Sequence, residues 1–387
     1  RGTASPDHVI RIKSRPLILR ETIWSKGREA IKQELDKYAE EYKAMFERQA
    51  PLANQPKTML PTDPKNIWME GIGLIGLGAN AKAASIAGDL AVQNARVRAI
   101  GEDAGGFRPI SEKDLFDCEY WSLEQAKLGK GAPPKFQGKI VMITGGSGTI
   151  GFAIAEAFSK LGAQTVLVDK DEITLKKAIT KLGHGHGYFS IDVTEADAAN
   201  QAMLAAIQKF GGLDILVSNA GAAHAGPMLS ISNDELRSAF ELNFFSHYSF
   251  STAAAKILKN QNRGGQILFN ISKQAVNPGR NFGAYGLPKA TTFFLMRQLA
   301  LELGSDGIRV NGVNADRIRS GLLTDDFISS RAKSRGVSES EYMAGNLLGK
   351  EVTAEHVADA FTSLACAEST TGHVMTVDGG NVEASLR

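Results

Sequence analysis

The chain has 387 residues, which is long for one domain and suggests two. Hydrophobic residues make up 43% and charged residues 22%, so a sizeable core is available and a disordered chain is excluded. The 44 basic and 42 acidic residues nearly cancel, which excludes the basic surface that nucleic acids and anionic membranes require. We therefore expect a small-molecule partner, with no nucleic acid and no membrane.

The two cysteines, Cys118 and Cys366, lie far apart and match no metal-ligand spacing. We predict packed thiols in a reducing compartment and no metal site. No run of about 18 apolar residues occurs, and the N-terminus is too polar for a signal peptide. These features favour a cytoplasmic enzyme. Because the chain opens on Arg1 rather than methionine, we expect it to be part of a longer polypeptide.

The first part of the chain, to about Pro134, has an irregular pattern. It predicts a long amphipathic helix over 29–50 and a second helix over 80–102, with proline-rich loop between them. The stretch 129–139 has the Gly, Pro and Lys content of a linker. We place the boundary there, between a smaller, mixed and mainly helical segment (1–134) and a second domain (135–387).

After residue 137, short apolar runs alternate with helical patterns, which is typical of βαβ units. The runs are apolar on both faces, as buried parallel strands are. Together they predict an α/β fold, a doubly wound parallel sheet of the Rossmann type with seven strands. The predicted strands cover 140–144, 165–169, 187–192, 215–220, 266–272, 309–315 and 373–380.

Two stretches, 71–78 and 144–151, contain the spacing G-x-G-x-x-G. The spacing alone is weak, because glycine-rich turns are common. The second stretch follows a predicted strand and opens a predicted helix, so its amides and the helix dipole would face a dinucleotide's phosphates. The first lacks a second strand that carries an acid, and we interpret it as a tight turn where backbones pass closely. The predicted cofactor loop comprises Gly145, Gly146, Ser147, Gly148, Thr149, Ile150 and Gly151.

Asp169 ends the next predicted strand. A carboxylate there accepts both ribose hydroxyls of NAD and repels the 2'-phosphate of NADP. We therefore predict NAD rather than NADP, although the neighbouring Lys170 would tolerate some NADP. The alternative, a surface turn residue, is disfavoured because Asp169 directly follows the apolar run TVLV.

Further candidate residues follow the other predicted strands, at the edge where doubly wound sheets bind ligands. The spacing Tyr-x-x-x-Lys puts Tyr285 and Lys289 on one face of a helix. A cation within about 4–6 Å favours an ionised phenol, so Tyr285 could accept a proton from a substrate alcohol. Additional cofactor-binding residues are predicted at Asp192, Val193, Asn219, Ala220 and Gly221.

These motifs, in this order, resemble the short-chain dehydrogenase/reductase family over about residues 136–380. The resemblance implies that Tyr285 is the general base and that Lys289 also holds the nicotinamide ribose. It implies that Ser272, 13 residues before the tyrosine, orients the substrate oxygen, and that Asn243 supports a water-linked proton relay. Relatives are commonly dimers or tetramers, so a homo-oligomer is expected.

The chain departs from the family pattern in three places. The glycine loop reads T-G-x-x-G-x-x-G, with Thr149 at the sixth place, a form that also occurs in the extended branch acting on nucleotide sugars. Ala315 and Asp316 replace the usual Pro-Gly. Pro288 lies inside the catalytic helix, where a first-turn position is tolerated, so we expect the helix to start near Ala284.

Near the replaced Pro-Gly, the resemblance assigns Ile318 and Ser320 to the nicotinamide carboxamide. Arg317 and Arg319 could bind a carboxylate or phosphate of the substrate. The alternative is ion pairing with Asp325, Asp326 or other acids. Three histidines have no other metal-ligating residues near them in the sequence: His184, His186 and His224. We expect them in solvent-exposed loops.

Four stretches, RGTASPDHVIRIKSRPL, EKDLFDCEYWSLEQAKL, VNADRIRSGLL and TVDGGNVEASLR, are similar to bacterial bifunctional proteins that fuse a class II sugar-phosphate aldolase to a short-chain dehydrogenase. The resemblance implies that residues 1 to about 130 are the tail of the aldolase, with its metal-binding histidines upstream. His8 alone cannot form a zinc site.

Our main hypothesis is an NAD-dependent oxidoreductase of carbohydrate metabolism that acts on a small hydroxyaldehyde, polyol or sugar-derived alcohol. The alternative is that the chain is part of a bifunctional protein whose main activity is class II aldol cleavage of a sugar phosphate. A non-catalytic NAD-binding scaffold and a sugar-nucleotide epimerase are further hypotheses.

Overall fold

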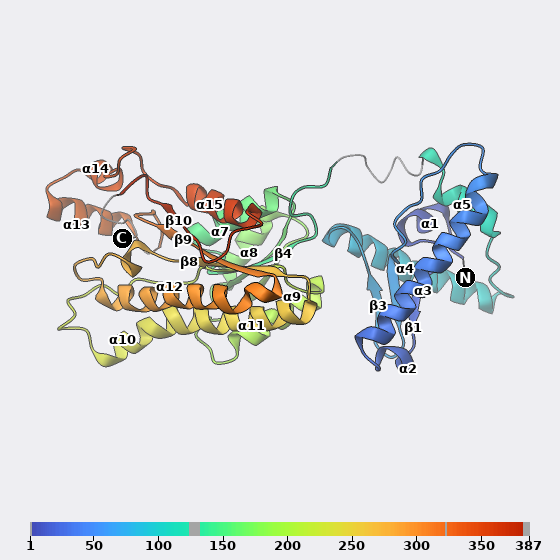
Figure 1. Cartoon of the computed structure of the whole chain (residues 1–387), viewed down its shortest axis with the longest axis horizontal. Coiled ribbons are helices and arrows are strands. Elements are labelled where there is room, and N and C mark those ends of the chain that lie inside the picture. Colours follow the sequence, from blue (N-terminus) through green and yellow to red (C-terminus); the bar gives the residue numbers. More distant parts are fainter. Residues whose placement is uncertain (1, 124–131, 322, 382–387) are drawn as a thin grey trace. The chain divides into compact units, whose positions relative to one another are not determined.

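The computed structural model describes residues 2–123, 132–321 and 323–381. The chain divides into two compact units, residues 1–133 and 134–387 (Figure 1). Part of the predicted linker, residues 129–131, lies outside the described residues. No helix among the described residues is long and apolar enough to cross a membrane. Within the same residues, neither Cys118 nor Cys366 forms a disulfide.

The N-terminal unit combines helices with a three-stranded sheet in which β1 pairs parallel with β2, and β2 pairs antiparallel with β3. The two long helices predicted from the sequence are present as α3 and α4. The elements in chain order are α1 (Pro6–Ile12), β1 (Leu17–Leu19), α2 (Glu21–Trp24), α3 (Arg28–Gln49), η1 (Ala50–Leu52), β2 (Asn66–Met69), β3 (Gly73–Gly76), α4 (Ala81–Asp103) and α5 (Glu112–Glu119).

The first glycine-rich stretch forms β3 and the connection to α4. A Cβ on Gly76 would lie 2.3 Å from the backbone oxygen of Ala84, and a Cβ on Gly78 would lie 2.3 Å from the backbone nitrogen of Ala84. These glycines therefore let the chain pass close to α4, as the sequence predicted. Because β3 pairs antiparallel with β2, the stretch does not have the parallel β-loop-α-β arrangement of a dinucleotide loop.

The C-terminal unit contains a parallel sheet of seven strands in the order β10-β9-β8-β7-β4-β5-β6, so the predicted fold class is confirmed. The chain runs outward from β4 to β6 and returns to place β7 on the other side of β4, which makes the edge between β4 and β7 a topological switch point. The strands are β4 (Ile140–Thr144), β5 (Gln164–Asp169), β6 (Gly187–Ser190), β7 (Ile215–Ser218), β8 (Gly265–Asn270), β9 (Ile308–Ala315) and β10 (Val374–Val377).

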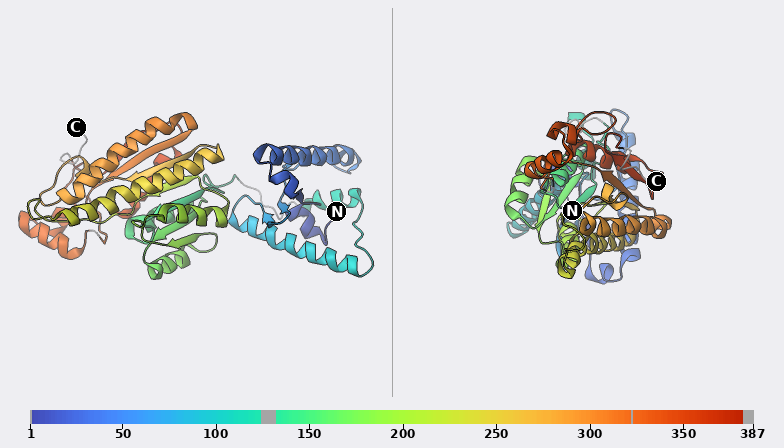
Figure 2. Two further views of the ribbon diagram at one scale, coloured as in Figure 1. Left: turned by 90° about the horizontal axis from the view of Figure 1, so that it is seen from below. Right: turned by 90° about the vertical axis from the view of Figure 1, so that its left-hand side faces the viewer.

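Helices cover both faces of this sheet (Figures 1 and 2). One core cluster joins the sheet to α9, α11 and α12, and a second joins it to α7, α8 and α15. The helices are α7 (Thr149–Lys160), α8 (Glu172–Leu182), α9 (Ala198–Phe210), α10 (Asn233–Phe240), η2 (Glu241–Phe245), α11 (Ser246–Gln261), η3 (Lys273–Ala275), α12 (Gly283–Leu303), η4 (Gly304–Asp306), α13 (Asp325–Arg335), α14 (Glu339–Met343) and α15 (Ala354–Cys366).

Two local features affect the site. Helices α13 and α14 pack around a small core of their own, formed by Leu323, Ile328, Ala332, Tyr342 and Met343. Helix α12 begins at Gly283, so Pro288 lies in its second turn. The predicted helix start near Ala284 is confirmed to within one residue, but the expectation that the proline would fall in the first turn is wrong. Pro288 has no N–H to donate to the carbonyl four residues earlier.

Candidate active site

The glycine loop after β4 brings backbone amides to the sheet edge. A Cβ on Gly151 would lie 2.1 Å from the oxygen of Gly145, so only glycine fits there. Helix α7 begins at Thr149 behind the N-cap Gly148, and within the described residues no side chain caps its first N–H groups. These amides, together with the positive end of the helix dipole, are open to an anion.

Asp169 lies at the tip of β5, beside this loop. Its carboxylate accepts hydrogen bonds from the hydroxyl of Ser147 at 2.7 Å and from the backbone N–H of Lys170 at 2.8 Å. The Lys170 ammonium lies 3.8 Å from the carboxylate of Asp192. Lys170, the neighbour of Asp169, therefore pairs with Asp192. The pKa of the Asp192 carboxyl is lowered mainly by the hydrogen bond that it accepts from the backbone N–H of Thr194.

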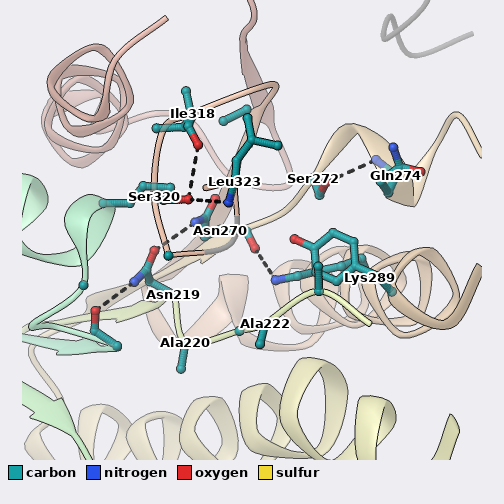
Figure 3. Close-up of a pocket in the computed structure, with 18 of the residues that line it drawn as sticks. Asn219, Ala220, Ala222, Asn270, Ser272, Gln274, Lys289, Ile318, Ser320 and Leu323 are labelled. Atoms are coloured by element: carbon teal, nitrogen blue, oxygen red, sulfur yellow. Dashed lines mark hydrogen bonds between the residues drawn. The ribbon is translucent and has the colours of Figure 1, made fainter. Parts of the chain in front are cut away.

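Asn219 ties together the carboxyl ends of three strands (Figure 3). Its side-chain amide donates to the backbone oxygen of Thr144 at 2.9 Å, and its side-chain oxygen accepts from the amide of Asn270 at 2.8 Å. The hydroxyl of Thr144 accepts from the backbone N–H groups of Asn219 and Ala220. The ends of β4, β7 and β8 are thereby held in one hydrogen-bonded unit.

Tyr285 and Lys289 lie on α12 and are 8% and 2% exposed. The Lys289 ammonium is 5.9 Å from the centroid of the Tyr285 ring and donates to the backbone oxygen of Asn270 at 3.0 Å. A second contact, at 3.4 Å, joins it to Nε2 of His247. The hydroxyl of Ser272 forms a hydrogen bond with the phenol of Tyr285. The structure thus brings three of the predicted catalytic side chains together.

Burial dominates the electrostatics of this group. It raises the pKa of Tyr285 to about 12, and the hydrogen bond with Ser272 lowers it only in part. Burial also lowers the pKa of Lys289 to about 7. Desolvation, and not the Lys289 cation, therefore sets the direction of the Tyr285 pKa, which is opposite to the lowering that the sequence predicted. Burial thus favours the neutral form of both side chains.

Asn243 lies in η2, a single π-helical turn between α10 and α11. Its side chain exchanges hydrogen bonds with the backbone of Ala222, at 3.0 and 3.2 Å, and donates to the backbone oxygen of Ala239. Its own backbone oxygen accepts from the hydroxyl of Thr292 on α12 at 2.7 Å. Such π turns occur frequently at functional sites, and this one joins the loop after β7 to α12.

One cavity of about 1210 Å³ extends from the glycine loop to α13 and α14. It exceeds the range of usual small-ligand sites, which leaves room for a dinucleotide and a small substrate. Gly146, Ser147 and Asn243 do not contribute to its surface. Predicted site residues that line it are Gly145, Gly148, Thr149, Ile150, Gly151, Asp169, Asp192, Val193, Asn219, Ala220, Gly221, Ser272, Tyr285, Lys289, Ile318 and Ser320.

Asp316 explains the departure from the usual Pro-Gly. Its buried carboxylate accepts from Lys273 at 2.9 Å and from the side chain of Asn381 at 2.7 Å, and Arg317 approaches it to 3.4 Å. Arg317 has a φ of 48°, a backbone conformation that few residues other than glycine adopt. The ion pairs and hydrogen bonds of Asp316 hold the segment in place of a rigid Pro-Gly turn.

Both arginines of this segment follow the ion-pair alternative. Arg319 pairs with Asp325 at 2.6 Å and with Glu351 at 2.7 Å, and Arg317 pairs with Asp316. Arg317 also lines the cavity, where its guanidinium lies 5.0 Å from the ring centroid of Tyr342.

Comparisons with known proteins agree with this architecture. Residues 146–381 match the family model described as enoyl-(acyl carrier protein) reductase, and residues 1–128 match aldolase class II, second domain. A short-chain type dehydrogenase/reductase from Mycobacterium ulcerans is 29% identical, with a TM-score of 0.58 over 64% of this chain and 90% of that chain. The chain belongs to the short-chain dehydrogenase/reductase family.

Two further relatives of this dehydrogenase are informative. The uncharacterized oxidoreductase YuxG of Bacillus subtilis is 31% identical over 100% of this chain, which spans 58% of the length of YuxG. A 3-ketoacyl-(acyl-carrier-protein) reductase from Brucella melitensis, complexed with NADH, is 26% identical, with a TM-score of 0.56 over 63% of this chain and 98% of that chain. The likeness to YuxG therefore includes the aldolase-like segment.

Sequence reasoning missed two side chains of the dehydrogenase site, His247 and Asn270. His247 is 1% exposed, lies one helical turn after Asn243 and bonds to the hydroxyl of Ser218 through Nδ1 at 2.6 Å. Burial and the neighbouring Lys289 hold the pKa of His247 well below its usual range. Its spacing from Asn243 was the available signal.

The prediction of exposed loop histidines is wrong for His186 and His224, which are half-buried, whereas His184 is exposed. Nδ1 of His186 accepts from the backbone N–H of Thr165 at 3.1 Å, and burial lowers the pKa of this histidine. His186 thus ties the strand β5 to the segment that enters β6. No cluster of metal-ligating side chains occurs in the part of the chain that the structure describes.

Proposed function

We propose that this dehydrogenase transfers a hydride between NAD and a small hydroxyaldehyde, polyol or sugar-derived alcohol. The observation that carries the proposal is the buried group of Tyr285, Ser272 and Lys289 in the same cavity as the glycine loop. A hydride acceptor bound along this cavity would reach a substrate whose oxygen contacts Tyr285.

The chain's residues fit a nicotinamide dinucleotide, the cofactor type of this family. The uncapped amides at the start of α7 suit the diphosphate, and the contact between Gly151 and Gly145 leaves no room for a side chain in the loop. Asp169, whose present partners are Ser147 and Lys170, suits two ribose hydroxyls, which is why we assign NAD over NADP. The bound nicotinamide ring supplies the hydride acceptor or donor.

Tyr285 handles the proton of the same reaction. Oxidation requires the phenolate form of Tyr285: as the substrate C–H bond gives up a hydride to the acceptor that the cofactor supplies, the hydroxyl proton passes to the phenolate oxygen. In reduction, the phenol donates that proton to the carbonyl oxygen, a role that suits its pKa of about 12. Ser272 holds the substrate oxygen beside the phenol, and a protonated Lys289 stabilises the phenolate.

Asn243 and His247 support this group. We assign the predicted proton relay to Asn243, whose backbone oxygen faces α12 and accepts from Thr292. His247 is a positioning residue, because its Nε2 gives the Lys289 ammonium an acceptor in addition to Asn270. The one remaining N–H of the ammonium is left for the cofactor.

The test is a spectrophotometric screen of small aldehydes, polyols and sugar acids with NAD and with NADP. We expect NADH formation with a polyol or hydroxyaldehyde, and its loss in Tyr285→Phe with NAD binding retained. Tyr248→Phe is the matched control, since Tyr248 is an exposed tyrosine on α11 outside the cavity. Turnover that survives in Tyr285→Phe would remove this residue from the mechanism.

A second candidate function is aldol cleavage by a longer polypeptide. It is supported by the aldolase match over residues 1–128 and by the greater length of YuxG. An assay of the complete gene product for sugar-phosphate cleavage, with and without a chelator, tests it. Cleavage that is absent, or insensitive to the chelator, would reject the class II mechanism.

We further propose a cytoplasmic homo-oligomer, a dimer or tetramer. Large apolar side chains are exposed next to α11 and on α12, including Phe245, Phe294 and Leu301, as expected where copies associate. Light scattering coupled to gel filtration would reveal a monomer if this is wrong.

A further inference from the structure

The end of the cavity away from the glycine loop is basic. Five cationic side chains line it: Lys273, Arg280, Arg317, Arg331 and Arg335. Lys273 and Arg317 are paired with Asp316 at 2.9 and 3.4 Å. For the other three, no carboxylate of the described residues lies within 4.0 Å. Three guanidinium groups at the substrate end therefore have no acidic partner.

Arg331 is the best positioned of the three. It is half-buried on α13, with its guanidinium 5.1 Å from the ring centroid of Phe282 and 5.5 Å from that of Phe327. These two rings meet at 82° with centroids 5.8 Å apart. Stacking on aromatic faces fixes the plane of a guanidinium. The side chain is thus held in place before any ligand binds.

Most of the donors of Arg331 are unused. A guanidinium has five N–H groups in a planar fork, and the single hydrogen bond of the Arg331 side chain within the described residues goes to the backbone oxygen of Arg280 at 3.3 Å. A fork of this kind matches the two oxygens of a carboxylate or phosphate. A neutral hydroxyl would leave most of the donors unsatisfied.

Arg331 is also close to the chemistry. Its stacking partner Phe282 directly precedes α12 and is three residues before Tyr285, and all three residues line the same cavity. An anion bound by Arg331 would therefore belong to a molecule that also reaches Tyr285. The cofactor diphosphate is expected at the opposite end, at the start of α7.

Arg335 lies one helical turn after Arg331, with its guanidinium 5.2 Å from the ring centroid of Tyr342. Like charges one turn apart destabilise a helix. Arg331 and Arg335 nevertheless both lie on the side of α13 that lines the cavity. A bound anion would offset the repulsion between them.

We infer that the substrate of this dehydrogenase carries an anionic group, a carboxylate or a phosphate, which Arg331 binds with Arg335 while the reacting hydroxyl or carbonyl contacts Tyr285. The inference rests on the proposed oxidoreductase function and narrows its substrate class.

The test compares matched pairs of compounds that differ in one anionic group: 3-hydroxybutyrate with 2-butanol, and glycerol 3-phosphate with glycerol. The ratio of kcat/KM for the anionic over the neutral member is measured with NAD in the wild type, Arg331→Gln and Arg331→Lys. We expect Arg331→Gln to lower the ratio by about 10- to 150-fold, mainly through KM, the range for a lost hydrogen bond to a charged group. Arg331→Lys keeps the charge without the fork, and we expect an intermediate ratio.

Arg297→Gln is the matched control. Arg297 stacks on Phe293, with its guanidinium 5.9 Å from the ring centroid, but it does not line the cavity. We expect its ratio to equal that of the wild type. A ratio unchanged in Arg331→Gln, or a wild type that prefers the neutral member of both pairs, overturns the inference.

A binding measurement separates this inference from the proposed function. Calorimetric titration of 3-hydroxybutyrate and of glycerol 3-phosphate into Tyr285→Phe, in the presence of NAD, reports anion binding without turnover. Binding that is lost in the Tyr285→Phe/Arg331→Gln double variant supports the inference even if no redox activity is found. Failure of both anions to bind overturns it whatever the activity, and the stronger anion identifies carboxylate or phosphate as the preferred group.

Discussion

Replacement of Asp169 by alanine should change the choice between the two nicotinamide cofactors. The carboxylate lies at the tip of β5 with Ser147 and Lys170 as its partners, where the 2'-phosphate of NADP would approach it. Two unit charges 4 Å apart repel by about 1 kcal/mol in water and about 4 kcal/mol at the effective dielectric constant of a protein surface. Since each 1.36 kcal/mol is about a tenfold effect, the loss of this repulsion favours NADP by roughly 5- to 900-fold.

The geometry adds to this effect in the variant. Without Asp169, the hydroxyl and backbone N–H of Ser147, which now point at the carboxylate, become free to donate to a phosphate. NAD also loses the acceptor of its ribose hydroxyls. The ratio of kcat/KM for NADP over NAD should therefore rise by at least about fivefold, with an absolute gain for NADP.

The assay is steady-state kinetics with both cofactors and one fixed substrate. Asp169→Asn tests the charge alone, because the amide is nearly isosteric and keeps an acceptor oxygen. Asp171→Ala is the control: its carboxylate caps α8 through the N–H groups of Ile173 and Thr174 and does not line the cavity. An unchanged cofactor ratio in both Asp169 variants would refute the ribose role of Asp169.

Three further predictions concern buried polar groups. Tyr285→Phe should lower kcat by about 10²- to 10⁴-fold with little change in Tm, because the hydroxyl of Ser272 keeps a backbone N–H donor at 3.2 Å; a large drop in Tm would show a structural role instead. His247→Leu removes an acceptor from the Lys289 ammonium, which lowers the pKa of this lysine, so the midpoint of the kcat pH profile should move to lower pH. His247→Gln should restore the midpoint, and identical profiles in all three proteins would exclude the contact from catalysis. In the N-terminal unit, burial raises the pKa of Glu119 in the folded protein above its ordinary value of 4.5. The stability that the neutral carboxyl contributes is therefore complete below pH 4.5. It is lost as the pH rises through the pKa of the folded state. Glu119→Gln stays neutral and should flatten the decline in Tm above pH 4.5, which thermal unfolding at a series of pH values would measure.

The features that could be predicted are those with local causes. The strand, glycine turn and helix over 140–160 depend on neighbours in the sequence, and so does the four-residue spacing that aligns Tyr285 with Lys289 on α12. The apolar runs predicted all seven strands of the parallel sheet, because a buried strand has to be apolar on both faces.

The remaining features arise from contacts across long sequence distances. Nothing near Lys289 in the sequence indicates that Asn270 and His247, on β8 and α11, would supply its acceptors. The charge of Lys289 predicted a lowered pKa for Tyr285, but burial has the larger effect, and burial depends on the whole packed structure. Arg331 is likewise brought to the cavity by the fold of α13, far beyond the catalytic helix.

The separate small core beneath α13 and α14 has a consequence for how this enzyme can diversify. Because its side chains belong to neither of the two clusters that hold the sheet, this segment can be rebuilt while the strand ends and their bonded asparagines stay fixed. Selectivity and reaction chemistry then evolve on different parts of the chain. Exchange of residues 323–343 between relatives, which span the small core, is thus the economical route to a new substrate with an unaltered proton-transfer apparatus.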